Sequence, residues 1–298
     1  MCSTSNQRVQ TATKCLNRIG RTLYPHQLEG IKWMMELEGN GTGGLLCDDP
    51  GLGKTYQALS LISSSPPTDT CLIVVPTSIV EQWRLAATEL IGKKSVHVQH
   101  GPKRPSYCPS NRVVITTYDL IVRDNGKEDY RKHHWTRIIL DEAHKIRNSS
   151  TLASKEIMRL KSTYRWGLTG SPVQNKQEDL TNLFRFVKAT RKRYMDSDLI
   201  NSHLKRRTIE GVLGKTIPKL EVEITEIPFI CDRERQFYKR VQNNVRREFS
   251  ELMALGGDPK DENVAMFELL LRLRQATQHP QLVLNGFTRK FMSNKKGG

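Results

Sequence analysis

The chain lacks several features that would place it in other classes of protein. Its six cysteines form no C-x-x-C pair, and none has histidine partners at the spacing of a zinc site. We therefore expect free thiols, a reducing compartment and no structural metal. The longest strongly apolar run, residues 72–75, is far too short to span a bilayer, and the N-terminus has no signal-type apolar core. We expect no membrane partner.

Aromatic and acidic residues are also scarce. Aromatic residues make up 7% of the 298 residues, and 31 acidic residues stand against 47 basic ones, which gives a net charge of +16. A protein this basic often binds a polyanion, although a solvated surface explains most single basic clusters. A protein that stacks single-stranded bases would need more aromatic side chains. The composition therefore favours contacts with nucleic-acid phosphates over the stacking of single-stranded bases.

Short apolar runs alternate with helical patterns from about residue 22 to residue 190. The β-branched residues and short lengths of the runs are typical of buried parallel strands. The candidate strands are 44–47, 72–75, 96–99, 113–117, 138–140 and 165–168, and the candidate helices are 56–63, 79–91, 152–161 and 180–187. Ser78 and Glu81 predict a capping box for the second helix. This alternation predicts an α/β fold with a mainly parallel sheet flanked by helices.

The remaining segments have a different pattern. Residues 1–20 are polar and predict a flexible arm, and residues 122–136 predict a charged surface loop. Residues 222–229 alternate like a strand, whereas 233–255 and 262–278 have the pattern of long helices. We therefore expect an arm at 1–20, an α/β lobe at 21–230, a helical extension at 231–285 and a tail at 286–298.

The segment Asp48-Asp49-Pro50-Gly51-Leu52-Gly53-Lys54-Thr55 lies between a predicted strand and a predicted helix. Strand, glycine loop, Lys-Thr and helix form the arrangement that binds a nucleoside triphosphate through loop amides and the helix N-terminus. Lys54 would neutralise the outer phosphates, and the Thr55 hydroxyl would bind Mg²⁺. Asp48 stands where the first glycine of the general G-x-x-x-x-G-K-[ST] pattern is expected.

Two further predicted strands end in polar side chains. Residues 138–140 are followed by Asp141 and Glu142. Asp141 would bind Mg²⁺ through its water shell, and Glu142 would orient and deprotonate the attacking water. Residues 165–168 are followed by Thr169-Gly170-Ser171-Pro172, which alone is an ordinary turn. Ligands of parallel sheets collect beyond the carboxyl ends of the strands, where all three motifs lie.

In this order, the motifs resemble the first motor lobe of the Swi/Snf-type DNA-dependent ATPases, in helicase superfamily two, over roughly residues 20–285. The resemblance implies a RecA-like P-loop NTPase lobe with ATP and Mg²⁺ as cofactors. Leu23-Tyr24-Pro25-His26-Gln27 resembles the adenine-side motif, in which Gln27 would read the adenine edge and Tyr24 would lie near the base. Gly51 to Thr55 would bind the phosphates, and His144, Thr169 and Ser171 would couple hydrolysis to lobe movement.

The resemblance also implies residues that contact DNA. Pro76 and Thr77 with Gln82, and then Thr117 with Tyr118, are similar to motifs that lie along the DNA backbone. The basic stretch Lys205-Arg206-Arg207 and the later Gln275-Ala276-Thr277-Gln278-His279-Pro280 resemble the connector into the second lobe. The implied partner is double-stranded DNA; nucleosomes, other DNA-bound proteins and a separate second motor lobe are further candidates. DNA and free thiols together indicate the nucleus or another compartment that contains DNA.

The sequence departs from the family pattern at Asp49 and Pro50, at His26, which replaces a usual aromatic residue, and after residue 280. Asp49 and Pro50 replace the usual Glu and Met, and Pro50 removes a backbone N–H near the phosphates. Nothing after residue 280 resembles the arginine-bearing second lobe, and an arginine finger contributes on the order of 10³–10⁵ in turnover. We therefore expect weak nucleotide binding and poor hydrolysis by the chain alone, as a fragment, a partner-dependent subunit or a degenerate relative.

Three functions remain open at this point. The chain is an ATP-dependent motor lobe that tracks duplex DNA, a DNA-binding module that has lost turnover, or a generic unwinding helicase of the same superfamily. The motor, identified by its resemblance, serves chromatin remodelling, repair or transcription control. The basic connector and the stretch ending at Pro280 favour the motor over the unwinding helicase.

Overall fold

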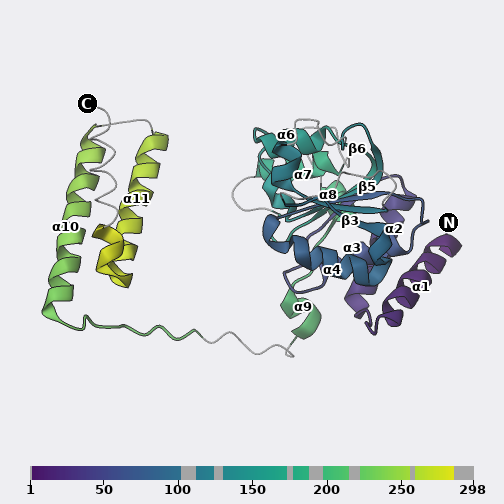
Figure 1. Cartoon of the computed structure of the whole chain (residues 1–298), viewed down its shortest axis with the longest axis horizontal. Coiled ribbons are helices and arrows are strands. Elements are labelled where there is room, and N and C mark those ends of the chain that lie inside the picture. Colours follow the sequence, from purple (N-terminus) through teal and green to yellow (C-terminus); the bar gives the residue numbers. More distant parts are fainter. Residues whose placement is uncertain are drawn as a thin grey trace. The chain divides into compact units, whose positions relative to one another are not determined.

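The computed structural model describes residues 2–101, 112–123, 130–172, 177–187, 197–214, 222–255 and 259–284. The chain divides into two compact units, Met1–Lys219 and Leu220–Gly298. The first is an α/β unit and the second is built from long helices (Figure 1). The division falls eleven residues before the boundary at 230 that the sequence suggests. Each unit is described by itself.

The α/β unit contains a seven-stranded parallel sheet with the order β3-β4-β2-β5-β6-β1-β7. The predicted α/β fold with a parallel sheet is therefore confirmed. The strands are β1 (Gly44–Leu46), β2 (Cys71–Val75), β3 (Val96–Val98), β4 (Val113–Thr117), β5 (His134–Asp141), β6 (Lys161–Leu168) and β7 (Leu204–Lys205). The first six correspond to predicted strands. β7 was not predicted because two residues in a basic segment carry no apolar pattern.

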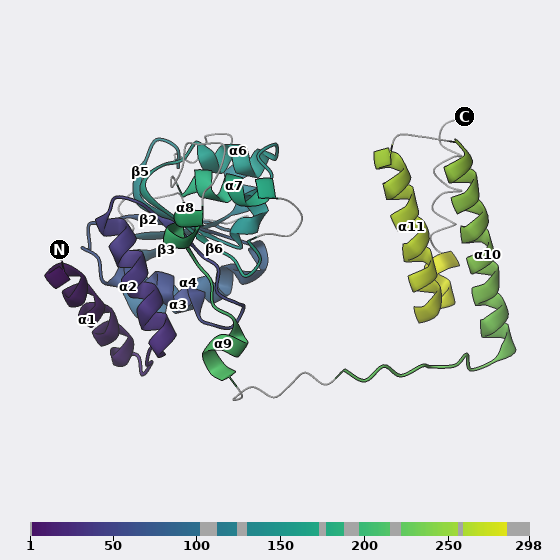
Figure 2. The same ribbon diagram turned by 180° about the vertical axis from the view of Figure 1, so that it is seen from behind.

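Helices cover both faces of this sheet (Figures 1 and 2). Side chains of β2 alternate between two cores, with Cys71, Ile73 and Val75 in one and Leu72 and Val74 in the other. The first core is covered by α1 (Cys2–Arg18), α2 (Pro25–Gly39), α3 (Lys54–Ser63) and α4 (Val80–Ile91). The second is covered by α5 (Tyr118–Arg123), α6 (Leu152–Met158), α7 (Gln177–Phe186) and α8 (Ser197–His203).

Helix α1 occupies the segment that was predicted to be a flexible arm, and that prediction is wrong. Val9, Ala12 and Leu16 are buried at a spacing of three and four residues, so they form one face of a helix. Val9 and Leu16 belong to the first core, and α1 lies beside α2 (Figure 2). Three small or medium apolar residues among polar ones were too weak a pattern to recognise in the sequence.

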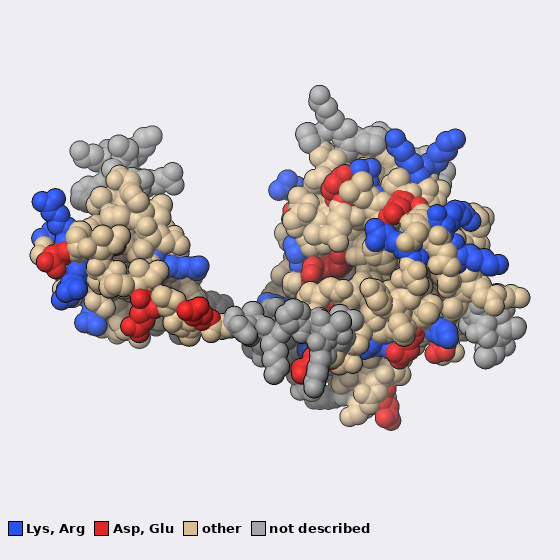
Figure 3. All heavy atoms as spheres, turned by 90° about the horizontal axis from the view of Figure 1, so that it is seen from below, with Lys and Arg blue, Asp and Glu red and all other residues tan. Residues whose placement is uncertain are grey.

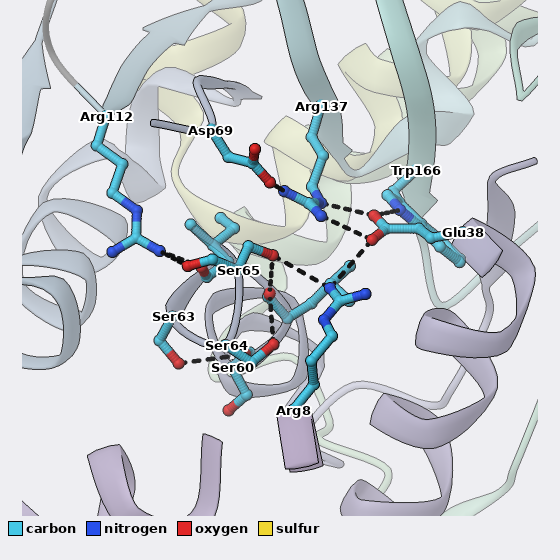
Figure 4. A network of polar contacts seen from close by, with 12 residues as sticks. Arg8, Glu38, Ser60, Ser63, Ser64, Ser65, Asp69, Arg112, Arg137 and Trp166 are labelled. Atoms are coloured by element: carbon cyan, nitrogen blue, oxygen red, sulfur yellow. Dashed lines mark hydrogen bonds and ion pairs between the residues drawn. The ribbon is translucent and has the colours of Figure 1, made fainter. Parts of the chain in front are cut away.

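A buried polar network lies near the amino ends of the strands (Figure 4). Arg137 of β5, which is opposite the first residue of β2, donates from Nε and Nη2 to the two carboxylate oxygens of Glu38, at 2.6 and 2.7 Å. Its Nη1 donates to Asp69 at 2.8 Å. Trp166 Nε1 and Arg8 of α1 also donate to Glu38, each at 3.2 Å. We call these five residues the scaffold network, because they join α1, α2, β5 and β6.

The helical unit consists of α10 (Asp232–Leu255) and α11 (Pro259–Gln278), which pack on each other. Their shared core contains Val241, Val245, Leu269, Ala276 and Val283. Two long predicted helices are therefore present. The predicted strand at 222–229 is not: this segment is exposed and joins no sheet in the described part of the chain. Alternation forms a strand only where a neighbouring strand supplies hydrogen-bond partners.

Several element ends differ from the sequence prediction. The 3₁₀ turn η1 (Thr77–Ile79) precedes α4, so Ile79 occupies the N-cap without a side-chain cap, and the predicted Ser78–Glu81 capping box is absent. The loop predicted at 122–136 is shorter at both ends, because α5 extends to Arg123 and β5 already begins at His134. Two short elements are η2 (Lys93–Ser95) and α9 (Ile209–Leu213). The predicted tail at 286–298 lies outside the described residues.

Among the helices that the structure describes, each is too short or too polar to cross a lipid bilayer. Cys15, Cys47, Cys71 and Cys231 are free thiols within the same residues. Burial raises the pKa of the Cys47 and Cys71 thiols to about 12 each, so both remain protonated at neutral pH. Both side chains lie in the core of the α/β unit.

Candidate nucleotide-binding site

The register of the sheet brings the three predicted motifs to one edge. β6 lies between β1 and β5, and Leu168 is opposite both Leu46 and Asp141. The backbone N–H of Thr169 then donates to the carbonyl of Leu46 at 3.2 Å. The loops that follow β1, β5 and β6 therefore begin side by side, although almost a hundred residues separate the first from the second.

The loop after β1 has the geometry of a phosphate-binding loop. Gly51 and Gly53 have φ values of 91° and 79°, which are accessible to glycine at little cost. Helix α3 begins at Lys54 without a side-chain cap, so the N–H groups of its first turn are not used by a capping side chain. Lys54 Nζ donates to the carbonyls of Asp48 at 2.6 Å and Asp49 at 3.2 Å. Thr55, half-buried, is in the same turn.

The beginning of α2 contacts this loop. A Cβ at Gly53 would lie 2.2 Å from Gln27 Nε2, so the close approach requires glycine. Gln27 Nε2 donates to the carbonyl of Leu52 at 3.2 Å, and its Oε1 accepts from the N–H of Tyr24 at 3.1 Å. The Tyr24 ring is 60% exposed and stacks on His26. The predicted adenine-side residues therefore lie beside the loop, where Gln27 holds its backbone and Tyr24 presents an accessible ring.

Asp141 is held in place by two donors. Trp83 Nε1 donates to its Oδ2 at 2.6 Å, and the backbone N–H of Glu142 donates to its Oδ1 at 2.9 Å. Burial raises the pKa of Asp141 above its ordinary value, and the charge of Glu142 acts in the same direction. The hydrogen bonds and the positive charge of Lys54 oppose this rise in pKa. Asp141 thus feels the charges of both Lys54 and Glu142.

A chain of contacts joins Glu142 to the turn after β6. Glu142 has a left-handed backbone, with φ 51° and ψ 51°, which is uncommon for a residue with a side chain. His144 Nδ1, in η3 (Ala143–Ile146), lies 3.2 Å from both Glu142 Oε2 and Thr169 Oγ1. The N–H of Ser171 donates to the same hydroxyl at 3.2 Å. The three predicted coupling residues are therefore consecutive members of one contact chain.

This chain continues to the phosphate loop. A Cβ at Gly170 would lie 3.0 Å from Pro50 Cδ, which shows how closely the two loops approach. Pro50, one of the departures from the family pattern, packs against the turn that contains Thr169 and Ser171. The phosphate loop and the turn after β6 are therefore in direct contact.

The predicted DNA-contacting residues have different surroundings. Thr77 and Gln82 are exposed and Pro76 is half-buried. Thr117 and Tyr118 are buried, and the Tyr118 hydroxyl donates to the carbonyl of Asp141 at 2.7 Å. Burial raises the pKa of Tyr118 well above its ordinary value, so the phenol stays neutral. The predicted contact of the Thr117 and Tyr118 side chains with nucleic acid is therefore corrected: they are part of the framework under Asp141.

The basic stretch after α8 also requires a correction. Arg206 is exposed, but Lys205 Nζ pairs with Glu29 at 2.5 Å and Arg207 pairs with Asp48 at 2.5 Å. The Arg207 side chain is only 13% exposed. A covered cation whose carboxylate partner is completely buried is a poor ligand for a DNA backbone. We therefore remove Arg207 from the predicted DNA-contacting residues, whereas contacts of Lys205, whose partner Glu29 is exposed, and of Arg206 stay predictions.

The sequence did not identify Trp83 or Asp48 as site residues. Trp83 is fully buried in the core between α4 and the sheet, and its N–H also donates to Asp141. Asp48 was noted only as a departure from a glycine pattern. A buried acidic residue next to a phosphate loop requires a cationic partner, and the basic stretch at 205–207 was the available signal.

A comparison with protein families decides the identity of the fold. The model of the SNF2-related domain matches residues 26–197, which is more than half of the chain. The chain belongs to the SNF2-related family. The resemblance to a Swi/Snf-type N-terminal motor lobe is thereby confirmed, and the SNF2-related domain covers every strand of the sheet except β7.

Individual relatives agree with this membership. The chain is 31% identical to an uncharacterized ATP-dependent helicase of Schizosaccharomyces pombe, over 88% of this chain and 31% of that protein. It is 31% identical to the DNA repair protein RAD5A of Arabidopsis thaliana, over 86% of this chain and 34% of that protein. The SNF2-related chain thus spans about a third of the length of these curated relatives.

Solved structures show the same fold. The SWI2/SNF2 ATPase core of Sulfolobus solfataricus, determined in complex with double-stranded DNA, matches with a TM-score of 0.58 at 24% identity. The match covers 88% of this chain and 60% of that one. At this identity the likeness concerns the fold.

Proposed function

We propose that this SNF2-related chain binds ATP with Mg²⁺ at the carboxyl edge of its sheet and is the N-terminal lobe of a motor that moves along double-stranded DNA. The observation that carries the proposal is the register that aligns the ends of β1, β5 and β6. It places the loop containing Lys54 and Thr55, the Asp141–Glu142 pair and the Thr169 turn at one edge. The fold family and relatives named ATP-dependent helicases support it.

The residues at this edge fit a magnesium nucleotide. Lys54 Nζ is held only by neutral carbonyl oxygens among its described contacts, so its charge is available for phosphate oxygens. The glycine loop and the uncapped start of α3 supply backbone N–H groups. Thr55 and Asp141 offer the hydroxyl and carboxylate that would hold Mg²⁺. The exposed ring of Tyr24 would stack on the adenine base. Bound Mg²⁺ would offset the charge of the phosphates.

Glu142 is suited to act as the general base. Its side chain is half-exposed, beyond the buried Asp141, and contacts His144, which in turn contacts Thr169. A base placed this way would orient a water molecule and accept its proton. His144, which contacts both Glu142 and Thr169, would transmit the protonation of Glu142 to the turn beside Pro50. Hydrolysis would thereby be coupled to a rearrangement of that turn.

Double-stranded DNA is the proposed partner, and the nucleus or another DNA-containing compartment the proposed location. Lys and Arg side chains are widespread on the face of the first unit seen in Figure 3, with acidic side chains interspersed. The net charge of +16 favours phosphate contacts. Thr77, Gln82 and Arg206 are exposed candidates for such contacts. Chromatin remodelling and DNA repair, represented among the relatives, are the proposed processes.

The deciding experiment compares Mg·ATP binding by the unaltered chain and by Lys54→Ala, using titration calorimetry. We expect Lys54→Ala to weaken binding at least about tenfold, since a charge-assisted contact with phosphate is lost. Arg159→Gln, which removes the positive charge of an exposed side chain paired with Glu156 of α6, is the matched control and should bind as the unaltered chain does. Equal affinity for all three proteins would refute the proposal.

A second experiment addresses turnover. Phosphate release is measured with saturating duplex DNA for the unaltered chain and for Glu142→Gln. A DNA-stimulated rate that disappears in Glu142→Gln supports a motor lobe with Glu142 as the base. ATP binding without any such rate would be expected equally of a DNA-binding module that has lost turnover and of a motor lobe that needs the arginines of a second lobe.

A further inference from the structure

Asp48 introduces a negative charge at the start of the phosphate loop. Its side chain is completely buried and its carbonyl accepts the hydrogen bond from Lys54 Nζ. The carboxylate is neutralised by Arg207, whose Nε donates to Oδ1 at 2.9 Å and whose Nη2 donates to Oδ2 at 2.5 Å. This paired, two-point geometry is the strongest kind of arginine–carboxylate contact.

The same guanidinium contacts two helices that line the site. Its Nη1 donates to the carbonyl of His26 at the start of α2, and its Nη2 donates to Gln57 Oε1 of α3 at 3.0 Å. Gln57 Nε2 in turn donates to Asp48 Oδ2 at 3.1 Å. Arg207 therefore joins the adenine-side segment, the first helix after the phosphate loop and the loop itself.

Backbone hydrogen bonds fix the segment that carries Arg207 beside the loop. The N–H of Cys47 donates to the carbonyl of Lys205 at 2.6 Å, and the N–H of Asp49 donates to the carbonyl of Arg207 at 2.9 Å. The N–H of Ile209 donates to the Asp49 carboxylate at 3.0 Å. Residues 205–209 thus run beside the first half of the phosphate loop.

We propose that Arg207 is a positioning residue of the nucleotide site, which binds the Asp48 carboxylate so that it does not compete with phosphate for Lys54. This inference rests on the proposed binding of Mg·ATP. Lys54 Nζ already contacts the main-chain carbonyl of Asp48, so we expect the carboxylate of the same residue, once released from Arg207, to turn toward the ammonium group. Arg207 acts through Asp48 and Lys54 and is not itself a catalytic residue.

The proposal makes the two partners of one ion pair behave oppositely. Arg207→Gln leaves the anion of Asp48 next to Lys54, and we expect Mg·ATP affinity to fall at least about tenfold. Asp48→Asn leaves the cation of Arg207 beside the site, and we expect affinity equal to that of the unaltered chain or higher. The double variant Asp48→Asn/Arg207→Gln removes both charges and should return affinity to within about threefold of the unaltered chain.

The experiment measures Mg·ATP affinity by calorimetry for these three variants, Arg207→Lys and the control Arg159→Gln, with circular dichroism to verify folding. A role limited to holding the loop together predicts that both single variants weaken binding and that neither rescues the other, which would overturn the proposal. If Arg207→Gln does not fold, Arg207→Lys decides: it retains the charge and should bind within about threefold, and a tenfold loss would overturn the proposal.

The same series separates this inference from the proposed function. If the unaltered chain and Lys54→Ala bind Mg·ATP equally, or neither binds it, the nucleotide site itself is wrong. If Lys54→Ala weakens binding and Arg207→Gln does not, the nucleotide site stands and the positioning role of Arg207 is refuted.

Discussion

Two arginine–carboxylate pairs of the same geometry lie at opposite ends of the sheet. Arg137 and Glu38 form the centre of the scaffold network near the amino ends of the strands, and their side chains are 3% and 2% exposed. Arg207 and Asp48 lie at the carboxyl edge, beside the phosphate loop, and their side chains are 13% and 0% exposed. Both pairs join segments that are distant in the sequence.

The difference between them lies in what the partners touch next. Glu38 also accepts hydrogen bonds from Trp166 and Arg8, so its surroundings are helices and strands. The carbonyl of Asp48 contacts Lys54, so the second pair borders a group proposed to bind phosphate. The type of ion pair therefore does not reveal its role. Its position along the strands does, because ligands of parallel sheets bind at the carboxyl ends.

The largest expected effect comes from breaking the scaffold pair. Glu38→Gln leaves Arg137 buried with less compensation, and we expect the free energy of unfolding to fall by about 3–5 kcal/mol. Mg·ATP affinity of the folded protein should not change, in contrast to Arg207→Gln. Urea unfolding followed by tryptophan fluorescence measures the first quantity and calorimetry the second, with Arg159→Gln as the control. A tenfold change in the Mg·ATP affinity of Glu38→Gln would show that the scaffold pair also affects the nucleotide site.

The next effect tests whether α1 belongs to the scaffold. Leu16 is 1% exposed in the first core, so Leu16→Ala should lower the free energy of unfolding by about 2–3 kcal/mol. Asn17→Ala, at the exposed neighbouring position, is the control and should have almost no effect. The same denaturant titration compares both variants. If Leu16→Ala leaves the free energy of unfolding unchanged, α1 does not contribute to the core and the prediction of a flexible arm at 1–20 stands.

A smaller effect is expected at the carboxyl edge. Trp83→Phe removes the donor to Asp141, which should raise the pKa of Asp141 further and lower the free energy of unfolding by about 1.5–2 kcal/mol at neutral pH. The pKa of Asp141 in the folded protein is above the ordinary value of 3.8. The free energy of unfolding therefore falls as the pH rises from 3.8 to the folded-state pKa, because over this range the unfolded chain loses its proton more readily than the folded one.

The additional loss in Trp83→Phe should therefore shrink as the pH falls through the raised pKa, where Asp141 is protonated. Unfolding titrations of both proteins at neutral and acidic pH measure this. A difference between the two proteins that does not vary with pH would show that Trp83 contributes packing alone.

The smallest effect is a change in titration. Lys54→Met removes a positive charge that lowers the pKa of Asp141, so this pKa should rise while the folded structure is retained. Carbon-13 NMR of the labelled aspartate carboxyl group measures the pKa in both proteins. No shift would mean that Lys54 and Asp141 do not face one another at this edge. Lys155→Met, on α6, is the control and should leave the pKa unchanged.

Much of the fold and the core of the candidate site were predictable from the sequence. Alternating apolar runs located six strands, because burial on both faces selects β-branched residues. The loop at 48–55 and the Asp141–Glu142 pair were predicted as site residues because each follows a strand and has residue types that suit one chemistry. Helix α1 and the absence of a strand at 222–229 were missed, since an amphipathic stripe and an alternating run acquire a structure only from what packs beside them.

The sequence by itself predicted which residues would bind phosphate, hold Mg²⁺ and accept a proton, because these capacities reside in single side chains and short loops. Tertiary structure alone decided that Tyr118 and Trp83 lie under or against Asp141, and that Arg207 serves Asp48 rather than the surface. The physical reason is that the partner of a buried polar group is set by strand order and register. Those are properties of the whole sheet, and they join residues as distant as 48 and 207.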